Sequence, residues 1–105
     1  MKFLITESKL TNLVFDYLNS QDFYKMKRDL GYVFWESKES WESGGYILIN
    51  ANRVNKECFV NSDLLVEVSS LFSLDLETSL NIIGEWIKTK IDFDFDYIFS
   101  NYGAD

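Results

Sequence analysis

The chain has 105 residues, of which 47% are hydrophobic and 17% aromatic, and its 17 acidic and 10 basic side chains give a net charge of −7. This apolar content excludes a disordered acidic protein, because disorder goes with few aromatic residues. Histidine is absent and Cys58 is the single cysteine, so zinc sites built on histidine and cysteine, and nucleophile–histidine catalysis, lack their residues.

The N-terminal residues contain one short apolar run, Phe3-Leu4-Ile5. A signal-peptide core needs about 7–15 apolar residues and a membrane span about 20, so we expect a cytoplasmic protein with no membrane contact. One cysteine cannot form an intramolecular disulfide, which suits a reducing compartment. Cys58 has apolar neighbours on one side and is expected to be buried rather than reactive.

Apolar residues then recur with helical spacing at positions 10, 13, 14, 17 and 18. This stripe predicts a helix over about residues 7–19. Thr6 is a suitable N-cap, and Ile5 has the spacing of a hydrophobic staple onto Leu10.

The middle of the chain is typical of strands. Runs of β-branched and aromatic residues are separated by polar residues; they are Tyr32–Trp35, Tyr46–Ile49 and Cys58–Val60, with Phe23–Met26 as a weaker edge strand. Gly44-Gly45 predicts one hairpin turn, and the polar stretch 50–55 predicts another. Connections this short favour an antiparallel meander.

The helical period returns after Val60. Asn61 or Ser62 can cap a helix whose apolar side runs from position 64 to position 72. After a break at 73–74, Asp75 can cap a third helix with an apolar stripe at 76, 80, 83 and 87, ending near Lys90. Trp86 flanks this stripe, where it would either complete the core or anchor a partner.

The tail alternates acidic and aromatic residues from position 92 to position 97. A strand over 92–99 would place Phe93, Phe95, Tyr97 and Phe99 on one face and three carboxylates on the other. We therefore expect an ordered strand whose aromatic face closes the core.

The same carboxylates, Asp92, Asp94 and Asp96, have the spacing that opens a calcium-binding loop. Tyr97 stands where such a loop needs glycine, and Gly103 where it needs glutamate. We interpret the three as a solvated strand face and expect neither a metal ion nor a cofactor.

Two acids at helical spacing, Asp63 and Glu67, could form a general acid–base pair in a cleft. Because 17 acids produce many such pairs and no histidine is present, we interpret these two as a solvent-facing helix edge. We expect no catalytic residues and no enzymatic activity.

Basic residues cluster only at Lys25, Lys27 and Arg28. Lysines are typical of exposed edge strands, where they oppose pairing with another chain. Nucleic-acid binding needs a larger basic surface, and Gly44-Gly45 lacks the lysine that completes a phosphate loop. Direct nucleic-acid binding is therefore not expected.

The surplus negative charge lies after Phe59. Residues 1–58 hold eight acids and eight bases, whereas residues 59–105 hold nine acids against two lysines. Glu77 and Glu85 lie opposite the apolar stripe of the third helix, and with Asp92, Asp94 and Asp96 they could form an acidic ridge. Carboxylates at this spacing can imitate nucleic-acid phosphates and bind a basic protein; the alternative is that they only keep the domain soluble.

Blocks at both ends resemble other sequences. The segments Met1–Leu10, Val14–Leu18, Leu71–Leu74 and Glu85–Ile87 are similar to small uncharacterised proteins of marine bacteriophages and environmental viral sequences. The resemblance leaves about residues 20–58 unmatched. It implies a phage-encoded accessory protein, and it implies no catalytic residues.

We predict an α+β fold: an antiparallel sheet of three to five strands with three helices packed on one face, forming a single domain over residues 1–105. The leading functional hypothesis is a non-enzymatic, acidic protein-binding module, as a phage-encoded inhibitor or nucleic-acid mimic acting on a basic host protein. The alternative is a virion or assembly accessory protein, which would present aromatic rather than acidic contacts. The oligomeric state is left open.

Overall fold

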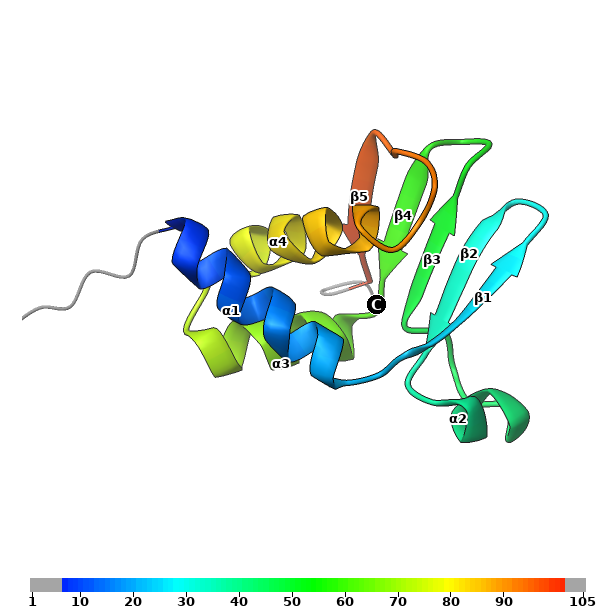
Figure 1. Cartoon of the computed structure of the whole chain (residues 1–105), viewed down its shortest axis with the longest axis horizontal. Coiled ribbons are helices and arrows are strands. Elements are labelled where there is room, and N and C mark those ends of the chain that lie inside the picture. The colour runs from blue at the N-terminus through cyan, green and yellow to red at the C-terminus, as the bar shows by residue number, and fades with distance from the viewer. Residues whose placement is uncertain (1–6, 102–105) are drawn as a thin grey trace, which may run out of the picture.

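The structure is a computed structural model that describes residues 7–101. These residues form four helices and five strands (Figure 1). In chain order the elements are α1 Glu7–Ser20, β1 Tyr24–Arg28, β2 Gly31–Trp35, α2 Lys38–Glu42, β3 Ile49–Asn52, β4 Glu57–Val60, α3 Ser62–Phe72, α4 Leu76–Lys88 and β5 Tyr97–Ser100. The helix expected over about 7–19 is thus confirmed as α1. Ile5 and Thr6, its predicted staple and cap, lie outside the described residues.

The strands form one mixed sheet in the order β1-β2-β3-β4-β5. The first four pair antiparallel, and short turns join β1 to β2 and β3 to β4. β5 instead pairs with β4 in parallel, because α3 and α4 lie between the two strands and carry the chain back to the starting end of β4. The α+β class is confirmed, whereas the expectation of a wholly antiparallel sheet is wrong at β5.

One side of the sheet packs against helices and forms the core. The central strands contribute alternate residues to it, namely Tyr32, Phe34, Ile49, Ala51, Cys58 and Val60. The helices contribute Val14 and Leu18 from α1, Leu64, Leu65 and Val68 from α3, and Ile82, Ile83, Trp86 and Ile87 from α4. Figure 1 shows α1, α3 and α4 together beside the sheet, which is compatible with the predicted three helices on one face.

The predicted N-caps of the second and third long helices are present. The Asn61 side chain accepts a hydrogen bond from the backbone N–H of Asp63 at 2.8 Å, and Asp75 accepts one from Thr78 at 2.7 Å. Ser73 adopts a left-handed conformation with φ 53°, which ends α3 at the predicted break. Side chains that bond free N–H groups thus set where these two helices begin.

The connection between β2 and β3 differs from the predicted hairpin. It contains the short helix α2, whose N-cap Ser37 accepts a hydrogen bond from the backbone N–H of Ser40. Gly44-Gly45 follows this helix, and β3 begins only at Ile49. The strand predicted at Tyr46–Ile49 is therefore wrong in its first three residues, because a capped helix forms in this connection and the chain reaches the sheet only at Ile49.

The acid–aromatic tail also departs from its prediction. Only Tyr97–Ser100 is a strand, and residues 92–96 form a bend and a loop. The backbone N–H groups of Asp96 and Tyr97 both donate to the carbonyl of Lys56, at 2.8 and 3.2 Å. Pairing with β4 starts at this point, so the predicted strand over 92–99 is wrong in its first half.

This change of geometry separates the four tail aromatics. Phe95 is 6% exposed and Phe93 is partly buried, whereas Tyr97 is 67% and Phe99 45% exposed. Ile98, between the two exposed rings, packs against the core. The prediction of one buried aromatic face is therefore wrong, since the loop and the strand place their aromatic residues on different sides.

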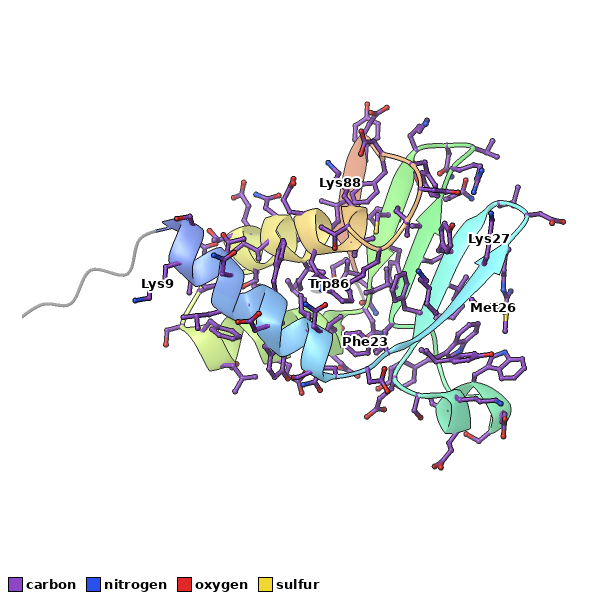
Figure 2. All side chains as sticks on the ribbon, viewed as in Figure 1. Lys9, Phe23, Met26, Lys27, Trp86 and Lys88 are labelled. Carbon is purple, nitrogen blue, oxygen red and sulfur yellow. The ribbon has the colours of Figure 1, made fainter. Side chains whose placement is uncertain are left out.

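Trp86 belongs to the core and does not project as a partner anchor. It is 3% exposed, and its indole N–H donates to the side chain of Asn19 at 2.9 Å. Its ring meets the ring of Phe23 edge-on at 5.9 Å, and Figure 2 shows both side chains between the helices and the sheet. The contacts fix the end of α1 against α4.

Candidate functional site

The residues predicted to form an acidic ridge are exposed, but cations interrupt them. Asp92 pairs with Arg53 at 3.2 Å and with Lys27 at 3.8 Å, and Glu85 pairs with Lys88 at 3.8 Å. Since residues 92–96 are not a strand, the three tail carboxylates do not lie along one strand face.

Two members of the ridge do come together. Glu85 and Asp96 line a depression of about 210 Å³ between α4 and β5, which Lys88 also lines. Glu77 lies on the exposed side of the same helix, and Asp94 is exposed in the loop. A binding role for Glu77, Glu85, Asp92, Asp94 and Asp96 stays a prediction.

A second acidic surface, the acidic hollow, combines carboxylates from separate elements. It is lined by Glu36, Asp63 and Glu67, together with Gln21, Phe23, Tyr46, Leu48 and Leu64, and has a volume of about 180 Å³. Its carboxylates come from the residue after β2 and from the first two turns of α3. Phe23, Leu48 and Leu64 provide an apolar lining.

Local structure explains how the carboxylates meet. The Asn61 cap starts α3 so that Asp63 and Glu67 lie one helical turn apart on its exposed side. Glu36 directly precedes Ser37, the N-cap of α2, at the point where the chain leaves β2. Because α3 follows β4 and β2 lies two strands away, only the folded sheet brings Glu36 to the other two.

Two tyrosines report the negative field of the hollow. The Tyr46 hydroxyl donates to Asp63 at 2.8 Å, and the Tyr17 hydroxyl donates to Glu67 at 2.6 Å. The hydrogen bond to Asp63, with the negative charges of Asp63 and Glu36, raises the pKa of Tyr46. Burial, followed by the bond and charge of Glu67, raises the pKa of Tyr17 to about 12. Both hydroxyls therefore remain donors at neutral pH.

Among residues 7–101, no lysine or arginine lines the acidic hollow. Within residues 7–101, the ion pairs use Asp92, Glu42 and Glu85 as their acids, and none uses a carboxylate of the hollow. This part of the chain also contains no group of three or more acidic, histidine or cysteine residues that could hold a metal ion.

The chemistry of the hollow fits a cationic side chain. Its volume is below the roughly 300–1,000 Å³ of drug-sized ligand sites, but one side-chain head group can enter it. Carboxylates bind ammonium or guanidinium groups by charge-assisted hydrogen bonds, and the apolar lining can contact the methylene stem of lysine or arginine.

Comparison with protein-family models, curated proteins and solved structures gives no match to this chain. In the described part of the chain, no helix has the length and apolar character needed to cross a membrane.

The sequence indicates Asp63 and Glu67 as a pair, but it does not indicate that Glu36, Tyr17 and Tyr46 share their site. The Tyr17–Glu67 contact spans 50 positions and the Tyr46–Asp63 contact spans 17. Spacing along one element can relate Asp63 to Glu67, but nothing in the sequence relates these residues to Glu36 or to a tyrosine in another element.

Proposed function

We propose that this chain is a non-enzymatic protein-binding module whose acidic hollow receives a lysine or arginine side chain of a basic partner. The observation that carries the proposal is the convergence of Glu36, Asp63 and Glu67 on one hollow that no lysine or arginine of the described chain lines. Three carboxylates without a cationic partner, gathered in a partly apolar recess, lower the free energy of a bound cation more than scattered surface acids do.

The resemblance to phage proteins supports a more specific role, that of a phage-encoded inhibitor in the host cytoplasm. Its partner would be a basic host protein that binds nucleic acid, with carboxylates of this chain in place of phosphates. The net charge of −7 supports attraction of such a partner at a distance. Glu77, Glu85, Asp94 and Asp96, outside the hollow, would add to the long-range attraction of a basic partner without contacting the bound side chain.

One observation favours the alternative of a virion or assembly accessory protein. Tyr97 and Phe99 are exposed on β5, and such rings suit a permanent contact between subunits. The two roles differ in their dependence on salt, because screening weakens an acidic interface and leaves an apolar one largely intact.

Two triple variants with the same change of net charge test the proposal. The hollow variant carries Glu36→Gln, Asp63→Asn and Glu67→Gln; the control carries Asp92→Asn, Asp94→Asn and Asp96→Asn. Amide oxygens can still accept the tyrosine hydrogen bonds, so both variants should fold. Binding of a labelled hexalysine peptide would be measured by fluorescence anisotropy at about 50 and 500 mM salt, and a host-lysate pull-down would be run under the same conditions.

We expect the hollow variant to bind hexalysine at least tenfold more weakly, and the control variant to bind within about threefold of the original chain. If the hollow variant kept its binding and the control variant lost it, the binding site would be the tail carboxylates and not the acidic hollow. Equal weakening of hexalysine binding in both variants would show that binding depends only on net charge, and this result would overturn the proposal.

A further inference from the structure

The side of the sheet that faces away from α1, α3 and α4, the open face, has an ordered pattern of side chains. Strand register aligns its residues in two rows across the sheet. The first row, from β1 to β5, is Arg28, Gly31, Asn52, Glu57 and Tyr97, and the second row is Met26, Val33, Asn50, Phe59 and Phe99. Figure 1 shows α2 beyond the end of β2, so these two rows are not covered by a long helix.

One half of the open face is hollowed. A depression of about 400 Å³, larger than the other depressions described above, is lined on this side by Leu30, Val33, Ile47, Asn50 and Arg28, among others. Leu30 is 57% exposed, so an apolar wall of the depression faces solvent. Unlike the acidic hollow, this depression is large enough to take more than one side chain.

The other half carries projecting rings. Phe59 and Phe99 meet edge-on at 5.7 Å, and Phe99 and Tyr97 are both largely exposed. The nearest depression beside these rings is only about 110 Å³. The open face therefore has apolar rings on β4 and β5 and a recess over β1, β2 and β3 whose apolar part is formed by Leu30, Val33 and Ile47, with Arg28, Asp29, Asn50 and Asn52 as its polar lining.

We propose that two copies of this chain dimerise through their open faces, about a two-fold axis that runs parallel to the strands above β3. Such an axis places β1 over the partner's β5 and β2 over the partner's β4, and each row lies over the same row of the other copy. The rings of each copy then enter the recess of the other. This reciprocal fit is what a two-fold interface requires, and it gives a sandwich of two sheets about 10 Å apart.

The polar residues of the two rows satisfy the same symmetry. Asn50 lies opposite Asn50 of the partner copy, and Asn52 lies opposite Asn52 of the partner copy. Two such carboxamides can hydrogen-bond each other, because each can both donate and accept. The backbone of Arg28 lies over the partner's Tyr97, beside the partner's Glu57. The Arg28 guanidinium lies 5.3 Å from the centre of the Trp35 ring in the single chain, and in the dimer it would turn toward the partner's Glu57, so each dimer gains two pairs of opposite charge. Within residues 7–101, neither Arg28 nor Glu57 takes part in an ion pair.

The size of the face sets the strength expected of the dimer. Five strands about 4.8 Å apart, with about four residues each at 3.4 Å, give a flat footprint of about 320 Å². A standard stable interface buries about 800 Å² per partner, so this smaller face predicts a weak, reversible dimer that is populated only toward the millimolar end of the concentration range. Because each copy carries a charge of −7, added salt should strengthen the dimer by screening repulsion, whereas it weakens the contact proposed for the acidic hollow.

A charge exchange across the interface tests this arrangement. Sedimentation equilibrium of the whole chain, from about 1 µM to 1 mM, should show the mass rising from 12.3 kDa toward twice that value. Arg28→Glu and Glu57→Arg should each weaken self-association at least tenfold. An equimolar mixture of the two variants should restore it to within about threefold, because both charge pairs are then reformed in the heterodimer.

Phe99→Ser provides a second variant, which removes a ring without a change of charge and should also weaken self-association at least tenfold. Circular dichroism would show that each variant is folded.

A chain that stays monomeric at 1 mM would overturn the proposal, as would a dimer that neither the charge variants nor Phe99→Ser weaken. Failure of the mixed variants to associate would exclude this two-fold arrangement. The hollow variant, with Glu36, Asp63 and Glu67 neutralised, should dimerise at least as strongly as the original chain, because it carries fewer negative charges, so the two proposals can fail independently.

Discussion

Gly31 occupies a position that other residues cannot take without strain. Its φ is 151°, and a Cβ atom built on it would overlap the backbone oxygen of Ala51 in the neighbouring strand. The close approach lets β2 pair with β3 where the β1–β2 hairpin turns back. Its conformation and its neighbour both require glycine.

We predict that Gly31→Ala lowers the free energy of unfolding by about 3 kcal/mol or more, because the strand pair must shift as well as adopt a strained backbone. Gly44→Ala is the matched control, since Gly44 also has a positive φ, 80°, but has no neighbour within 4 Å of a Cβ atom. The control should lose only about 1–2 kcal/mol. Urea denaturation of both variants would measure the difference, and equal losses would show that the contact with Ala51 is unimportant.

Cys58 is fully buried in β4, and burial raises the pKa of its thiol to about 12 from an ordinary value of about 9. Above pH 9 the thiol ionises in the unfolded chain but not in the folded one. The stability that depends on the neutral thiol is therefore complete below pH 9 and is lost as the pH rises toward 12.

We predict that ionisation of this thiol in the unfolded chain lowers the free energy of unfolding by about 2 kcal/mol between pH 7.5 and pH 10.5. The decrease is about 1.36 kcal/mol per pH unit above pH 9. Cys58→Ala should be less stable at pH 7.5, because it leaves a small cavity, but it should lose about 2 kcal/mol less over the same pH interval. Tyrosine ionisation affects both proteins alike. Identical pH dependence in urea denaturation would show that the thiol does not control alkaline stability.

At the scale of elements, the segment after α4 joins the two layers of the molecule. Phe95 is buried, and the Lys88 ammonium lies 5.0 Å from the centre of its ring. Gly84 of α4 leaves space for this segment, since a Cβ atom there would lie 2.9 Å from Ile98 and 3.8 Å from Phe95. β5 then completes the sheet beside β4. The loop thus stabilises the fold by burying Phe95 in the core, and the strand stabilises it by backbone pairing with β4.

We predict that a chain ending after Lys90 melts at a clearly lower temperature, because it loses both contributions. Phe95→Ala should cost about 3–5 kcal/mol, whereas Phe99→Ala, at an exposed ring, should cost less than about 1 kcal/mol. The variant with Asp92, Asp94 and Asp96 changed to Asn should also stay folded, because the ion pairs of Asp92 are exposed. A large loss from Phe99→Ala in thermal denaturation would instead support a wholly buried aromatic face.

At the scale of the whole molecule, two surfaces of different chemistry lie on different parts of the fold. The acidic hollow lies beside the start of α3, and the open face lies across the outer side of the sheet. Salt should weaken cation binding at the first and strengthen self-association at the second. A dimer would therefore present two acidic hollows to a basic partner, and linked sites can bind more tightly than single ones.

The sequence predicted the features that depend on near neighbours. Helix α3 begins directly after Asn61, one of its two predicted caps, and α4 directly after its predicted cap Asp75, because an N-cap bonds residues two or three positions away. The strands β2 and β4 follow from their apolar runs, and β1 from its weaker one. The exposed β1 edge also carries the lysines expected of an edge strand.

Tertiary structure decided what depends on distant neighbours. The period of Asp92–Tyr97 is that of a strand, yet the loop forms because Phe95 can reach the core between α4 and the sheet, and burial of an aromatic ring outweighs local strand preference. The parallel pairing of β5 follows from the two helices before it. Glu36, Asp63 and Glu67 meet because sheet order brings the end of β2 beside the start of α3, and no periodicity in the sequence encodes that approach.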